Sequence, residues 1–123
     1  MLNQHDIEDY KSDGWIQPQG TKYDSDKPPI ALVDPEFIEG LARVLGFGAN
    51  KYSPDNWRNG ISYRRLISAA YRHLGAINKG ENIDPESGEP HVYHLACCNM
   101  FLAAIMKHRP DLDDRWKPDN LWK

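Results

Sequence analysis

The sequence predicts an all-α fold: a small helical bundle with polar N- and C-terminal arms and a core completed by oligomerisation. Three segments between residues 34 and 108 repeat apolar side chains at helical spacing. Residues 1–33 are polar and interrupted by glycine and proline, and residues 109–123 have no clean period. The 123 residues suit one domain. We therefore expect arms over 1–33 and 109–123 on either side of a helical domain over 34–108.

The first helix is expected to begin at Asp34, whose side chain can cap the helix, with Pro35 at the first helical position. Glycines 46 and 48, followed by the turn-forming residues 53–56, end it near residue 50. One apolar stripe runs along this helix through Phe37, Leu41, Val44 and Leu45.

The second helix is expected after Ser62, a plausible cap, and the third after Pro90. The third should end before Arg109–Pro110, because proline disfavours helix at the preceding residue. The second helix has an apolar stripe that includes His73 and is formed by Leu66, Ile67, Ala70, Leu74 and Ile77. The inward positions of the third helix are Leu95, Cys98, Leu102 and Ile105.

Three helices of this length bury a small core alone, so we expect a homo-oligomer, a dimer or a tetramer. Trp116 and Trp122 in the C-terminal arm are candidate anchors for the contact. Alanines that would let neighbouring helices approach closely recur at 69, 70, 96, 103 and 104.

The charge and cysteine content narrow the class of partner and the compartment. A net charge of -3 argues against direct nucleic-acid binding and against an anionic membrane surface, which leaves a small molecule as the expected partner. No apolar run approaches the roughly 18 to 20 residues of a membrane span. Cys97 and Cys98 are neighbours in an apolar stretch, where a mutual disulfide would be strained. We expect a reducing, cytoplasmic location.

Histidines and acids concentrate around the connection between the second and third helices. His91 and His94 are three residues apart and share one helical face, while Glu81 and Asp84 lie in a turn that reverses the chain. This reversal would bring both pairs and His73 to one end of a helix pair. A lone histidine here would be a core residue bonded to a carbonyl, but five such groups are hard to satisfy independently. They predict a shared site, with Glu81, Asp84 and His73 as catalytic candidates.

Mixed imidazole and carboxylate ligands suit manganese, zinc or iron, whereas carboxylates alone would favour magnesium. The first helix adds Glu36 and Glu39 three residues apart. Glu39 either belongs to a solvated face, pairing with Arg43, or reaches an active site in an oligomer. The candidate metal ligands are Glu39, His73, Glu81, Asp84, His91 and His94.

The loop over residues 48–58 combines cations and aromatic rings, which could neutralise phosphates and stack on a base. The simpler interpretation is a helix-ending turn with Trp57 as a hydrophobic anchor. The candidate substrate-binding residues are Lys51, Tyr52, Trp57, Arg58 and, beside His73, Arg72. A Walker-type phosphate loop, a dinucleotide fingerprint, a nucleophile elbow and zinc-finger cysteine spacing are all missing from the sequence.

Taken in order, these motifs resemble those of the phage dATP/dGTP diphosphohydrolases, small proteins linked to the MazG-like, all-α nucleoside triphosphate pyrophosphohydrolases. The resemblance covers about residues 20–106. The motifs that carry it are Lys22–Asp24 with Lys27–Pro28, Phe47–Tyr52, Asn56–Arg58, Arg72–Leu74, Gly80–Glu81, Asp84, Glu86–Gly88, His91 and His94.

The resemblance implies hydrolysis of a purine deoxynucleoside triphosphate to the monophosphate and pyrophosphate, dependent on Mg²⁺ or Mn²⁺. The helical domain would then be catalytic, and a phage-encoded chain would act in the host cytoplasm. MazG-like enzymes hold their metals with acidic helix motifs. Here only Glu36-x-x-Glu39 and Glu81-x-x-Asp84 approach those motifs, and histidines stand where acids are expected, so Zn²⁺ or iron is possible as well.

Two alternatives come from other classes. One is a different metal-dependent phosphohydrolase, either a triphosphohydrolase or a phosphoesterase. The other is a non-enzymatic phage accessory protein that binds a nucleotide or a protein, with structural histidines.

Overall fold

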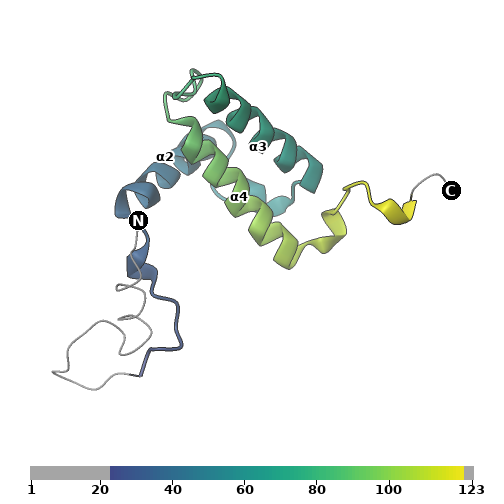
Figure 1. The fold of residues 1–123 in the computed structure, drawn as a ribbon, viewed down its shortest axis with the longest axis horizontal. Helices are drawn as coiled ribbons and strands as arrows, with labels where there is room; N and C mark the ends of the chain where they lie inside the picture. The colour runs from purple at the N-terminus through teal and green to yellow at the C-terminus, as the bar shows by residue number, and fades with distance from the viewer. Residues whose placement is uncertain (1–22, 121–123) are drawn as a thin grey trace. The chain divides into compact units, whose positions relative to one another are not determined.

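The computed structural model describes residues 23–120 and confirms an all-α fold for them. The chain divides into two units, residues 1–33 and 34–123. The first unit contributes a 3-10 turn, η1 (Ile30–Leu32), to the described residues. The second contains α2 (Pro35–Lys51), α3 (Tyr63–Asn78) and α4 (His91–His108), with 3-10 turns η2 (Asn56–Asn59), η3 (Pro110–Leu112) and η4 (Pro118–Asn120) (Figure 1). Among residues 23–120 the β-structure amounts to one isolated bridge, Ile83 to Pro90.

The helix α2 begins and ends as its sequence predicts. The Asp34 carboxylate accepts the Glu36 N–H at 3.1 Å, and Pro35 takes the first helical position. At the other end the Tyr52 N–H donates to the Gly48 carbonyl at 2.9 Å. Glu36 and Glu39 are exposed, and Val44 is buried.

The N-terminus of α3 lies where Ser62 predicts it, but the capping group is different. Ser62 makes no capping bond with its side chain. The Asp114 carboxylate instead accepts the Arg64 N–H at 2.9 Å, from fifty residues further along the chain. The segment after α4, expected as a second arm, therefore returns to α3, where the Arg115 guanidinium also lies 5.1 Å from the Tyr63 ring centre.

The core lies between α3 and α4, which run side by side (Figure 1). Its buried side chains are Tyr63, Leu66 and Ile105, and the partly buried ones against them are Ile61, Ile67, Phe101, Leu102 and Leu112. The prediction that Leu74 points inward is wrong, since it is half exposed. His73, one residue earlier in the chain, faces α4 instead. Its ring lies beside the rings of His91 and His94.

The predicted inward positions of α4 are confirmed as partly or fully buried, and Cys97 is buried as well. Two sides of α4 are covered because it contacts both α2 and α3. Both cysteines are free thiols. Burial raises the pKa of Cys97 to about 12, so its thiol stays protonated and is a packing group at neutral pH.

Apolar side chains remain exposed on α2 at Phe37 and Ile38, and after η3 at Trp116. They offer surface to the predicted homo-oligomer, which stays a prediction. Trp122, the second predicted anchor, and Lys22 of the N-terminal motif lie outside the described residues. Over residues 23–120, every helix is too short or too polar to cross a membrane.

The helices α2 and α4 cross where Gly40 meets Tyr93. A Cβ atom on Gly40 would clash with the Tyr93 ring. The same ring meets Phe37 edge-on, with ring centres 5.7 Å apart, and has the Arg43 guanidinium 5.8 Å from its centre. The missing side chain at Gly40 thus lets Tyr93 hold α2 against α4.

This crossing predicts opposite effects for two glycines of the same helix. Gly40→Ala should lower the free energy of unfolding, because overpacking costs about 1–3 kcal/mol and exceeds the gain in helix propensity of about 1 kcal/mol. Gly46→Ala, with nothing within 4 Å of its Cβ, should raise it by about 0.5–1 kcal/mol. Urea unfolding followed by circular dichroism measures both, and equal stabilisation by the two substitutions would contradict the packing.

Candidate functional site

The connection between α3 and α4 is a short hairpin that brings the predicted site residues together. The His91 N–H donates to the Asn82 carbonyl at 2.9 Å, and the Asp84 N–H donates to the Glu89 carbonyl at 2.9 Å. Gly80 and Gly88 adopt positive φ of 94° and 74°, a conformation that glycine takes without strain. The hairpin places Glu81 and Asp84 over the first turn of α4.

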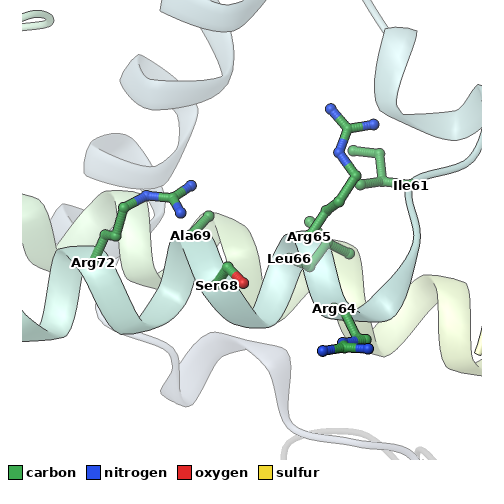
Figure 2. A pocket seen from close by; sticks show the side chains of 7 residues that line it. All are labelled: Ile61, Arg64, Arg65, Leu66, Ser68, Ala69 and Arg72. Carbon is green, nitrogen blue, oxygen red and sulfur yellow. The ribbon is translucent and has the colours of Figure 1, made fainter. Parts of the chain in front are cut away.

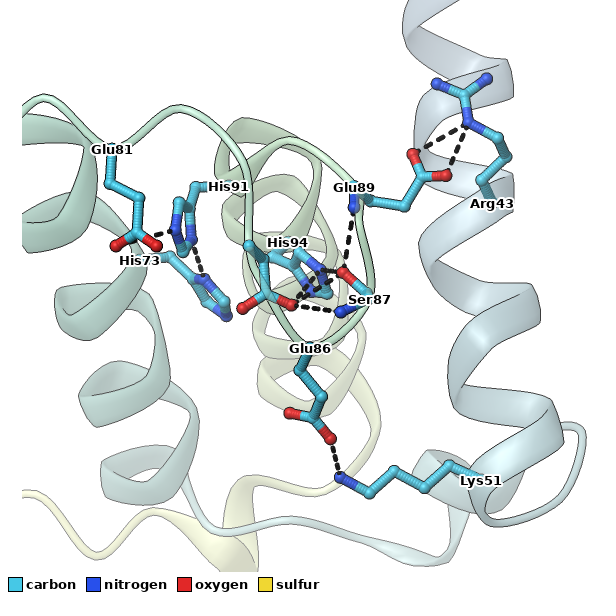
Figure 3. Close-up of polar contacts among 10 residues, drawn as sticks. Arg43, Lys51, His73, Glu81, Glu86, Ser87, Glu89, His91 and His94 are labelled. Carbon is cyan, nitrogen blue, oxygen red and sulfur yellow. Dashed lines mark hydrogen bonds and ion pairs between the residues drawn. The ribbon is translucent and has the colours of Figure 1, made fainter.

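Ser87 joins this hairpin to α4. Its hydroxyl lies 2.7 Å from the Asp84 carboxylate and 2.6 Å from Nε2 of His94, and it also accepts the Glu89 N–H at 3.2 Å (Figure 3). The Ser87 N–H donates to the same carboxylate oxygen, Oδ2 of Asp84, at 3.0 Å. One hydroxyl therefore uses its donor and both acceptor positions.

These contacts fix the tautomer of His94. An ionised carboxylate only accepts hydrogen bonds, so the Ser87 hydroxyl must donate to Asp84. The hydroxyl then has no second proton for His94, and His94 must donate from Nε2 to the serine oxygen. In the neutral ring Nδ1 is left with a lone pair, which can accept a proton or bind a cation.

Asp84 is ionised in this arrangement. Burial opposes ionisation, but the hydrogen bonds from the Ser87 hydroxyl and N–H, together with the nearby His94, outweigh it and hold the pKa of Asp84 below its usual value. His94 and Asp84 are also 3.4 Å apart, from Nε2 to Oδ2. The Ser87 hydroxyl is committed to a carboxylate, so it is a structural group and not an activated nucleophile.

A second pair of rings lies beside the first. Nδ1 of His73 is 2.9 Å from Nδ1 of His91, so one ring donates a proton and the other accepts it. Nε2 of His91 is buried without a hydrogen-bond partner among residues 23–120 and lies 3.7 Å from Oε2 of Glu81. A proton on His91 Nε2 would point at that carboxylate, and His73 would then donate from Nδ1 and keep a lone pair on Nε2.

The His73 ring also stacks on His94, with ring centres 4.7 Å apart and planes 10° apart. Burial lowers the pKa of His73, and the neighbouring histidines His94 and His91 lower it further, against the opposing effect of Asp84. The ring is therefore neutral at pH 7 and is available as a proton acceptor. We call His73, Glu81, Asp84, His91 and His94 the histidine cluster.

Two ion pairs tie the hairpin to α2. Nε of Arg43 contacts both carboxylate oxygens of Glu89 at 3.0 and 3.1 Å, and Nζ of Lys51 contacts Glu86 at 2.6 Å (Figure 3). The Phe47 ring meets His94 edge-on at 6.5 Å between centres. Lys51, a predicted substrate-binding residue, thus lies near the cluster but already has a carboxylate partner.

The aromatic loop is placed differently. The Trp57 ring stacks on Phe101 of α4 at 4.6 Å, and the Arg58 guanidinium lies 4.5 Å from the same ring centre. A nucleobase stacking on Trp57 would therefore compete with Phe101 and with Arg58, which also pairs with Asp55 at 2.7 Å. Tyr52 is exposed beside Lys51. The roles predicted for these loop residues stay predictions.

Among the remaining candidates, Arg72 lies next to the cluster and Glu39 does not join it. Arg72 is exposed and its charge acts on His73. Glu39 is exposed on α2, where its charge acts on Arg43 one turn away, and none of its described contacts reaches a histidine. A ligand role for Glu39 stays a prediction.

The donor set of the histidine cluster is of the type that binds divalent cations, because imidazole nitrogens and carboxylate oxygens lie beside one another. Among residues 23–120, no three His, Cys, Asp or Glu side chains are already arranged to hold an ion. Side-chain rotation would therefore have to accompany binding.

Sequence reasoning missed Ser87 as the centre of the hairpin and missed the Arg43–Glu89 pair. The signal for Ser87 was available, since aspartate and serine three residues apart in a turn rich in glycine and proline commonly bond to each other and to the backbone. The pairing of Arg43 with Glu89, 46 residues apart, depends on how α2 crosses α4 and has no local signal.

Comparison with known proteins gives one family. The family profile described as dATP/dGTP diphosphohydrolase, N-terminal, matches residues 17–115. The dATP/dGTP diphosphohydrolase of Salmonella phage PMBT28 is 41% identical over 96 residues, which make up 78% of this chain and 33% of the phage protein. The chain thus spans about a third of the length of this curated relative. No solved structure matches the chain.

The lowered pKa of His73 predicts how stability depends on pH. At pH values between the lowered pKa of His73 in the folded chain and its ordinary pKa of about 6.5, His73 binds a proton in the unfolded chain but not in the folded chain. The free energy of unfolding of the metal-free protein should therefore fall as the pH is lowered through and below about 6.5. Denaturant titrations at several pH values should show this slope reduced in His73→Asn and retained in His108→Asn, a change of an exposed histidine at the end of α4. Identical slopes in both variants would contradict the assignment.

Proposed function

The chain belongs to the dATP/dGTP diphosphohydrolase N-terminal family, as its motifs predict, and from this membership we propose that it hydrolyses dATP and dGTP to the monophosphate and pyrophosphate. The segment matched in this chain makes up 33% of the relative that is named for this activity, so the proposal is that the N-terminal part carries chemistry of its own.

The observation that supports the proposal is the histidine cluster. His73 lies 2.9 Å from His91 and stacks on His94, and carboxylates lie 3.7 and 3.4 Å from the outer nitrogens of His91 and His94. Buried polar groups are expensive unless they are satisfied or functional, and one nitrogen here is unsatisfied. Perturbed, coupled titratable groups of this kind concentrate at active sites.

The proposal includes dependence on a divalent metal ion, Mg²⁺ or Mn²⁺, with Zn²⁺ or iron as alternatives. His94, Glu81 and Asp84 are the residues that would hold it. His91 is not among them, because a cation on its Nε2 would leave its proton on Nδ1, facing His73, and would remove the lone pair from Nε2 of His73. A bound divalent cation would neutralise phosphate charge and lower the pKa of coordinated water. Glu81 is half exposed and can turn without disturbing the hairpin, whereas Asp84 is held by Ser87.

The chemical step needs a proton acceptor, and His73 suits this role. Its ring is neutral at pH 7 because of its lowered pKa, and Nε2 has the lone pair in the tautomer argued above. A water oxygen would attack the α-phosphorus while its proton passes to His73. The bond from the α-phosphorus to the bridging oxygen would then break, which releases pyrophosphate and leaves the monophosphate.

In this proposal Arg72 meets negative charge that develops on the phosphates, and its exposed position next to His73 in the chain supports this role. Lys51 could contribute only after leaving Glu86, an exposed pair of small net strength. The homo-oligomer and the cytoplasmic location belong to the same proposal. Oligomer contacts would cover the apolar side chains that α2 exposes, Phe37 and Ile38.

A second candidate function is nucleotide binding without turnover. It is favoured by one observation: the chain matches only a third of a longer relative, and the family profile that it matches is described as N-terminal. The histidines would then be structural and the catalytic groups would belong to another part of such a protein.

One experiment separates the candidates. The purified chain is incubated with a panel of ribo- and deoxynucleoside triphosphates, with Mn²⁺, Mg²⁺ or Zn²⁺ or with chelator, and the products are separated by chromatography. The proposal expects dAMP or dGMP with pyrophosphate, and no turnover with chelator. Nucleoside with triphosphate would indicate a triphosphohydrolase, and nucleotide binding without any product would indicate the second candidate.

Substitutions in the hairpin test the site itself. Asp84→Asn keeps an oxygen that can accept from Ser87, and Glu81→Gln keeps the side-chain length, so each removes charge with little change in shape. Each should lower kcat by about a hundredfold or more, because phosphoryl transfer depends on positioning and electrostatics. Glu86→Gln removes a charge from the same hairpin on the Lys51 side and should leave kcat near wild type. Wild-type turnover in Asp84→Asn and Glu81→Gln would make these acids structural.

A further inference from the structure

Outside the histidine cluster, α3 carries an open groove of about 420 Å³. It is lined by three arginines, one serine and three apolar side chains (Figure 2). One of the lining residues is Leu66, a buried core residue, so the groove adjoins the core between α3 and α4. The arginines are Arg64, Arg65 and Arg72.

Helical spacing arranges these side chains in two rows. One row contains Arg65, Ala69 four residues later and Arg72 three residues after that. Figure 2 shows all three side chains projecting to the same side of α3. The small side chain of Ala69 leaves room between the two guanidinium groups. Seven residues of helix separate Arg65 and Arg72 by about 10 Å along the axis. Arg64 and Ser68, four residues apart, form the other edge.

The arginines of this groove differ from the other arginines of residues 23–120 in their partners. Four arginines elsewhere in the described chain each pair with a carboxylate: Arg43, Arg58, Arg109 and Arg115. Within residues 23–120, none of the three groove arginines makes such an ion pair, although the Arg64 backbone N–H bonds Asp114. A protein with net charge -3 thus gathers its unpaired guanidinium groups on one helix face. Such groups bind phosphates through paired N–H donors.

The groove also leads to the candidate site. Arg72 forms its end and directly precedes His73, on which its charge acts. An anion lying along the groove would therefore have one end beside the histidine cluster and the other near Arg65. A single phosphate would not span this distance, whereas a chain of phosphates would.

We propose that the groove binds the β- and γ-phosphates of the nucleotide, with Arg72 and Arg65 as successive partners and the α-phosphate left beside the histidine cluster. This inference rests on the proposed function for the identity of the ligand. It adds Arg65 as a binding residue and gives the leaving pyrophosphate its own subsite. A nucleic-acid backbone would present similar phosphates but is disfavoured by the acidic net charge.

Inorganic triphosphate tests the groove without requiring catalysis. Calorimetry of the full chain with triphosphate, in chelator and at low ionic strength, should show binding that is much tighter than that of orthophosphate. Arg65→Ala and Arg72→Ala should each weaken binding by about tenfold or more, the usual loss of a charge-assisted contact. Arg65→Lys should recover part of the loss, because it keeps the charge without the paired donors. Lys107→Ala, an equal loss of charge at a residue of α4 that does not line the groove, should leave binding unchanged.

The outcomes separate this inference from the proposed function. Hydrolysis of dATP without any Arg65-dependent binding of triphosphate would overturn the groove and leave the function standing. Arg65-dependent binding without hydrolysis would support the groove and count against the function. Tighter, Arg65-dependent binding of a single-stranded oligonucleotide would overturn the assignment to a nucleotide. Amide shifts along α3 on adding triphosphate to wild-type protein give a second readout that needs no variant, and shifts confined to other helices would contradict the groove.

Discussion

The hydrogen bonds of the Ser87 hydroxyl are the constraint on which the rest of the candidate site depends. One oxygen connects the Asp84 carboxylate, the His94 ring and the backbone of the hairpin. Because Asp84 can only accept, the serine proton is assigned, and the tautomer of His94 follows from it. His73 then stacks on a ring of fixed orientation and pairs with His91. The hairpin thus determines the orientation of the three histidine rings, beginning with His94 and continuing through His73 to His91.

The rest of the fold holds this hairpin from two sides. The α2 helix reaches it through the Arg43–Glu89 pair and packs on α4 because Gly40 leaves space for Tyr93. The α3 helix supplies His73 and is itself capped by Asp114 from beyond α4. Exposed ion pairs contribute little free energy. The packing at Gly40 and in the α3–α4 core therefore determines how the helices are arranged, and the ion pairs of Arg43 and Lys51 only adjust the position of the hairpin.

The helices and the meeting of His73 with His91 and His94 could be predicted from sequence, since helical period, caps and a turn rich in glycine and proline are local signals.

Three features of the structure could not be predicted from sequence. Leu74 satisfies the apolar period, yet it is half exposed, and His73 takes the position that faces α4. Trp57 suits a base-stacking loop, but Phe101 and Arg58 cover its ring. Asp114 takes over the cap expected from Ser62. Each depends on contacts between distant segments, about which local patterns carry no information.

The tautomer of His94 most directly tests whether the Ser87 hydroxyl orders the histidine cluster. Long-range proton–nitrogen correlation spectra of the metal-free, nitrogen-labelled chain at neutral pH report which ring nitrogen of each histidine carries the proton. We expect His94 to be protonated at Nε2 alone in the wild-type protein and to lose this preference in Ser87→Ala. A His94 ring protonated at Nδ1, or one that exchanges between tautomers equally in both proteins, would show that Ser87 does not order the cluster.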